Sequence, residues 1–103
     1  SLETEERRLP VIALLRGQAL LSSGRVDDAA AAFGRAIHLG PREEPSVLRT
    51  VSRIWLARVE TRRGDTAAAR RAYQDVFGFW KDADPDIPIL VEAKAEYAAL
   101  DVR

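Results

Sequence analysis

Six positions in the first half of the chain have counterparts forty residues later, two of them identical and two others of similar type. The first set is separated by intervals of 7, 5, 4, 3 and 5 residues and consists of Gly17, Gly24, Ala29, Phe33, Ala36 and Pro41. The second set keeps these intervals and consists of Ala57, Gly64, Ala69, Tyr73, Val76 and Lys81. An internal period of this length is typical of proteins in which each repeat is one supersecondary unit. The spacing therefore predicts two structural units of the same design.

Each unit is predicted to be a pair of helices. Apolar residues do not alternate with a period of two over any long stretch, so no strand is expected. Gly24 and Gly64 are placed to end helices in the left-handed conformation. Asp65 or Thr66 is expected to cap the helix after the second of these glycines, and Asp86 to cap the last helix. The five helices are expected at residues 10–23, 26–39, 45–63, 66–81 and 86–100.

The repeated small residues are expected to let helices approach closely. Gly17 and Ala57 fall in the middle of predicted helices, where glycine in particular lowers helix stability. Their use is explained if a partner helix crosses there at short distance, with Ala29 and Ala69 as the matching small residues. Phe33 lies one turn beyond Ala29 on the same face and is expected to fill the space beyond the crossing.

The first set follows the order small residue, turn glycine, alanine, aromatic, alanine and proline. In this order and spacing the chain resembles the tetratricopeptide repeat (TPR) family, over roughly residues 9–100. The resemblance implies an all-α fold in which antiparallel helical hairpins stack as a short right-handed solenoid. The expected parts are an N-terminal extension at 1–8, repeats at 9–41 and 45–81, and a capping helix at 86–100. The first residues of the extension are typical of the remainder of an expression tag.

Two features depart from the family pattern. The first repeat has Ala13 and Arg16 where the family has a large aromatic and a leucine, and the second has Val76 and Lys81 at its last two positions. The period is 40 residues rather than about 34. The extra residues fall at 40–46 and are expected to lengthen the third helix or the loop before it.

The C-terminal half resembles, more specifically, the end of TPR arrays attached to bacterial serine/threonine kinases and to winged-helix regulators. The resemblance rests on the stretches 64–77, 80–90 and 96–100. It implies that the chain is the C-terminal part of a larger bacterial signalling or regulatory protein, located in the cytoplasm. It also implies a scaffold function, in which the chain binds another protein.

In TPR proteins the first helix of each hairpin lines a concave groove that binds a partner protein or peptide. The residues expected to line this groove are Val11, Leu14, Gln18, Leu21, Val51, Ile54, Arg58 and Arg62. Arg58 and Arg62 share one helix face, where they could bind a carboxylate or phosphate of the partner. The alternative is a pair of solvated arginines. The asparagine and lysine by which some members hold a C-terminal carboxylate are replaced by Gln18 and Arg58.

The predicted first helix is apolar around most of its circumference. Its apolar residues are Leu9, Val11, Ile12, Leu14, Leu15, Leu20 and Leu21. A helix of this kind is normally covered on both sides, and its own hairpin covers only one. We therefore expect an upstream repeat or a second copy of the chain to pack on it, which makes homodimerisation the main alternative function. A thin exposed stripe is the remaining explanation.

Composition argues against several other functions. Sixteen basic and sixteen acidic residues cancel, so no net charge favours nucleic acid. The apolar run 9–15 is far shorter than the roughly 20 residues of a membrane span. The chain has no cysteine, and a lone His38 makes a poor zinc site. Asp82, Asp84 and Asp86 alternate as in a calcium loop, but the glycine and glutamate of such a loop are missing.

No arrangement of residues indicates catalysis, so no enzyme activity, metal or cofactor is expected. Tyr73, Phe77 and Trp80 are expected to pack under the last helix rather than to stack on nucleobases. A small-molecule sensor is a third hypothesis, and it would require an enclosed pocket.

Overall fold

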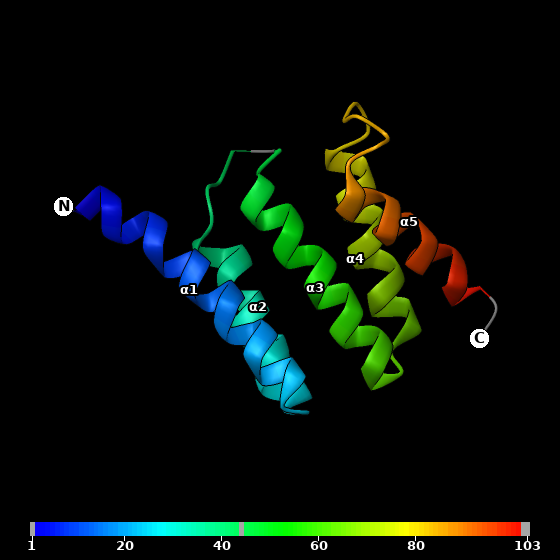
Figure 1. The fold of residues 1–103 in the computed structure, drawn as a ribbon, viewed down its shortest axis with the longest axis horizontal. Helices are drawn as coiled ribbons and strands as arrows, with labels where there is room; N and C mark the ends of the chain where they lie inside the picture. Colours follow the sequence, from blue (N-terminus) through cyan, green and yellow to red (C-terminus); the bar gives the residue numbers. More distant parts are fainter. Residues whose placement is uncertain (1, 44, 102–103) are drawn as a thin grey trace.

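The computed structural model describes the backbone of residues 2–43 and 45–101, and the side chains of residues 8–43 and 45–101. Its described residues form five helices and no strand. The helices are α1 (Leu2–Ser22), α2 (Val26–Leu39), α3 (Val47–Arg63), α4 (Thr66–Phe79) and α5 (Pro88–Leu100). The all-α prediction is confirmed for these residues. Figure 1 shows α1 and α2 at one end of the molecule, α3 in the middle, and α4 with α5 at the other end.

The two predicted turn glycines end α1 and α3. Gly24 and Gly64 have φ angles of 80° and 81°, which only glycine adopts without steric cost. The residue after each glycine donates its backbone N–H to a carbonyl in the last turn of the helix. Arg25 N–H donates to the Leu20 carbonyl at 2.9 Å, and Asp65 N–H donates to the Glu60 carbonyl at 3.0 Å. This pattern closes the C-terminal end of a helix and reverses the chain.

The N-terminal caps follow the sequence in part. Asp65 caps α4, because its Oδ1 accepts a hydrogen bond from the Ala68 N–H at 3.0 Å. The predicted cap at Asp86 is wrong: Ile87 occupies the N-cap of α5 without a side-chain hydrogen bond. Asp86 instead donates its backbone N–H to Asp84 Oδ1 at 2.9 Å, in a turn that ends before the helix begins.

Five helix ends differ from the prediction: α1 begins eight residues earlier and ends one residue earlier, α3 and α5 each begin two residues later, and α4 ends two residues earlier. The first helix begins at Leu2 rather than at residue 10, with Pro10 inside it, so residues 2–8 belong to α1 and Ser1 lies outside the described residues. Proline costs one backbone hydrogen bond, but the Glu and Arg residues before it favour helix. The extra residues do not lengthen α3, which begins at Val47. Ser46 is its N-cap, and the Ser46 side chain accepts the Arg49 N–H at 3.3 Å.

The crossing of α1 and α2 depends on the absence of a side chain at Gly17. A Cβ atom built at this position would lie 2.5 Å from Cε1 of Phe33. Phe33 and Ala29 are fully buried, as is Ala36. The small residues predicted at this crossing are therefore confirmed, whereas Pro41 at the end of the same pattern is exposed.

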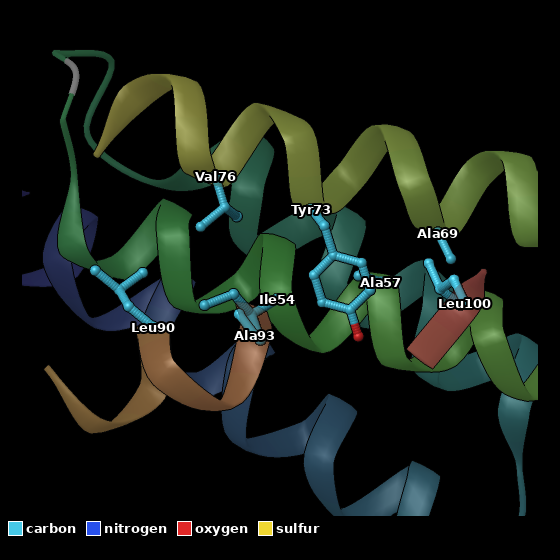
Figure 2. Packing of buried hydrophobic residues seen from close by; sticks show 8 residues of the cluster. All are labelled: Ile54, Ala57, Ala69, Tyr73, Val76, Leu90, Ala93 and Leu100. Carbon is cyan, nitrogen blue, oxygen red and sulfur yellow. The ribbon is translucent and has the colours of Figure 1, made fainter. Parts of the chain in front are cut away.

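The second hairpin repeats this arrangement and adds α5. Figure 2 shows Val76 and Tyr73 of α4 directed towards Ile54 and Ala57 of α3. The buried residues of this cluster are Ile54, Ala57, Ala69, Tyr73, Val76, Leu90, Ala93 and Leu100, of which the last three belong to α5. The predicted packing of Phe77 and Trp80 under the last helix is also confirmed. A smaller cluster of Leu21, Ala29, Phe33 and Val59 joins the two hairpins.

Candidate functional site

Four of the seven large apolar side chains that are exposed in the described part of the chain lie together on α1. Leu9, Ile12 and Leu15 are 50%, 51% and 58% exposed, and Val11 is 43% exposed. By contrast, Ala13 and Leu21 on the same helix are buried. The helix is therefore covered on one side only, as its sequence predicts, and four large aliphatic side chains within seven residues are left in contact with water.

A groove of about 320 Å³ runs between this exposed side of α1 and the outer side of α2. Its apolar lining includes Leu9, Ile12, Leu20 and two alanines of α2. Three arginines also line it: Arg16 from α1, Arg35 from α2, and Arg25, which forms an ion pair of 2.7 Å with Asp28. We call this hollow the outer groove.

A second, wider hollow opens at the other end of the same surface. It is lined by Leu9 to Val11 of α1, by the last two residues of α2 and the four that follow them (residues 38–43), and by Leu48 of α3. Leu9 lines both hollows, so they adjoin. Val11 is the one residue of the predicted concave groove that lines either of these two hollows.

Two of the predicted groove residues lie in the core. Ile54 is fully buried against α4 and α5, and Leu21 is buried between the hairpins. Leu14, Gln18 and Val51 are half-buried. The helical spacing placed these residues on one face of each helix. It could not show how much of that face is covered by α5 and by the neighbouring hairpin.

The two predicted anion-binding arginines contact groups of their own chain. Arg58 donates two hydrogen bonds of 2.9 Å, from Nε and Nη2, to the two carboxylate oxygens of Glu96. Its Nη2 also lies 3.3 Å from Oε2 of Glu92, and its guanidinium stacks over the ring of Trp55 at 4.8 Å. Arg62 donates to the backbone carbonyl of Leu21 at 3.3 Å. Arg58 thus binds a pair of carboxylates, and α5 supplies them.

Tyr73 completes this polar cluster, because its hydroxyl donates to Glu96 Oε1 at 2.8 Å. The hydrogen bond from Arg58 to Glu96 favours the charged guanidinium and raises the pKa of Arg58 above its usual value, against the opposing effect of burial. Burial, followed by the nearby Glu96 carboxylate, raises the pKa of the Tyr73 hydroxyl. The cluster attaches α5 to α3 and α4. Sequence reasoning missed its acidic half, although the spacing of Glu92 and Glu96 places both on one helix face.

Within the described part of the chain, no three His, Asp or Glu side chains lie close enough to hold a metal ion. None of the described helices combines the length and the apolar character needed to cross a membrane. Comparison of the chain with protein-family models, with curated proteins and with solved structures gives no match.

Proposed function

We propose that this chain is a protein–protein interaction module built from TPR-like hairpins, stacked as a short right-handed solenoid. In this proposal it forms the C-terminal part of a larger cytoplasmic signalling or regulatory protein of bacterial type, and it has no catalytic role. The observation that carries the proposal is the row of large aliphatic side chains on α1, which adjoins two hollows. Exposed apolar patches beside hollows are typical of binding surfaces.

The proposal places the partner against α1 rather than against Arg58. Arg58 already binds the carboxylate of Glu96 on α5, so a carboxylate or phosphate of a partner would have to compete with it. Ile12 and its neighbours, in contrast, require nothing to move. Homodimerisation through α1 is the second candidate, since the same exposed residues favour it.

Photocrosslinking from α1 tests the proposal. A photoreactive amino acid replaces Ile12 in cells that make the full protein, and Val91, an exposed aliphatic on α5, serves as the matched control position. We expect a discrete crosslinked product from position 12 and none from position 91. A product of twice the full protein's mass would identify the homodimer. The absence of any product from position 12, or identical products from both positions, would refute the interaction function.

A further inference from the structure

The internal repeat shows what kind of element fits the exposed side of α1. In the second hairpin, the corresponding side of α3 is covered by α2: Trp55 stacks on Phe33 with ring centroids 5.9 Å apart, and Val59 is buried in the same cluster. Forty residues earlier, Trp55 corresponds to Leu15 and the buried Ser52 corresponds to Ile12. A position that contacts a helix in the second repeat, Trp55, is therefore exposed in the first, and a buried position, Ser52, is exposed there as well.

The shape and chemistry of the outer groove also favour a helix. From Leu9 to Leu20 the groove follows α1 for about 16 Å, or three helical turns. Its walls are mostly side chains of two helices, and the backbone N–H and C=O groups of a helix pair with one another along its axis. An extended segment placed there would find no backbone partners for its own N–H and C=O groups, whereas a helix satisfies these groups internally.

The charges at the groove specify the helix further. Arg16 and Arg35 are exposed, line the groove and form no ion pair with a described residue. The third arginine is already paired with Asp28. A ligand with acidic side chains beside its apolar stripe would complement the two remaining arginines.

The same charges disfavour a second copy of α1 as the occupant. In an antiparallel pair of α1 helices centred on Ile12, Arg8 of one copy lies opposite Arg16 of the other, by their equal distance from the centre. Both side chains are exposed. Like charges at such an interface weaken association and suppress the wrong partner.

We infer that the outer groove binds an amphipathic helix of another protein, about three turns long, with Asp or Glu flanking its apolar stripe. This inference rests on the proposed function and names the partner's chemistry. Ile12 and Leu20 would bury the apolar stripe of the partner helix. Arg16 and Arg35 would form ion pairs with its acidic side chains.

Two synthetic helical peptides test the inference by fluorescence anisotropy with the whole chain. Both carry Leu and Ala at helical spacing, and their flanking residues are Glu in one and Lys in the other. We expect the acidic peptide to bind about tenfold more tightly, with a preference that weakens at high salt. The double variant Arg16→Glu/Arg35→Glu should reverse the preference, and Arg71→Glu, an exposed arginine on α4 outside the groove, should leave it unchanged.

The outcomes separate this inference from the proposed function. If both peptides bind equally and Ile12→Glu abolishes the binding, the inference of an acidic partner helix is refuted. The proposal of an interaction surface on α1 would then still stand. No binding of either peptide, with the circular dichroism spectrum of a folded chain, would also overturn the inference. A dimer that dissociates on Ile12→Glu in light scattering would identify a second copy as the occupant. The absence of any photocrosslinked product from position 12 would refute the proposed interaction function itself.

Discussion

The α-carbon of Gly17 faces the ring of Phe33 so closely that a Cβ atom added at Gly17 would lie within 3 Å of three ring carbons. Phe33 is fully buried and stacks on Trp55 of the next hairpin. Its ring therefore cannot shift without disturbing the contact between the hairpins. The first testable consequence concerns this crossing.

Gly17→Ala should lower the free energy of unfolding by about 1 kcal/mol, because overpacking in a core outweighs the gain in helix propensity. Gly34→Ala is the matched control: Gly34 is also helical, but a Cβ atom there meets nothing within 4 Å. It should raise stability by about 0.5–1 kcal/mol. Urea denaturation followed by circular dichroism measures both. An equal gain in the two variants would contradict the close crossing.

Gly64→Ala should lower the free energy of unfolding by about 1 kcal/mol, since a Cβ atom strains the left-handed conformation. Gly64→Asn should cost less, because asparagine tolerates this region better. The Cβ position at Gly64 is open, so the cost would come from backbone strain alone. Thermal unfolding of the two variants gives the comparison. If alanine proved as stable as glycine, the turn would not require a positive φ.

Glu96→Gln should destabilise the chain by about 1 kcal/mol, because it weakens a charge-assisted pair with Arg58 and the contact to Tyr73. The control is Glu92→Gln, which changes a longer and more exposed contact of 3.3 Å and should alter stability by less than about 0.5 kcal/mol. Chemical denaturation measures the two variants side by side. Equal effects would show that the distance and exposure of the carboxylate do not decide its contribution.

Stability should fall at alkaline pH. The pKa of Tyr73 is raised in the folded chain, so the folded state holds this proton more tightly than the unfolded state, whose tyrosine pKa is about 10. The contribution is complete below about pH 10 and is lost as the pH rises above it. Urea midpoints between pH 8 and 11 should decline less steeply in Tyr73→Phe than in the natural sequence. Parallel declines would exclude Tyr73 as the source.

Local sequence signals were sufficient for most of the fold. Gly24 and Gly64 marked both turns, since the left-handed conformation strongly favours glycine. Ala29 and Ala69 marked the crossings, and both are fully buried. These features depend on the residue itself and on its near neighbours in the chain.

Features that depend on distant residues were not predictable. Arg58 and Glu96 are 38 residues apart in the chain, and no local pattern joins them. The burial of Ile54 depends on how α4 and α5 pack over it. The start of α1 ahead of Pro10 shows the opposite error, in which one strong local signal outweighed the helix-favouring residues before it.

The contacts that Trp55 makes with both Phe33 and Arg58 have a consequence for the way the chain denatures. Phe33 lies on α2 and Trp55 on α3, with their rings 5.9 Å apart. Arg58 lies over the ring of Trp55 and forms an ion pair with Glu96 of α5. A continuous line of contacts thus runs from the first hairpin to the last helix, so the five helices should melt cooperatively in a single step.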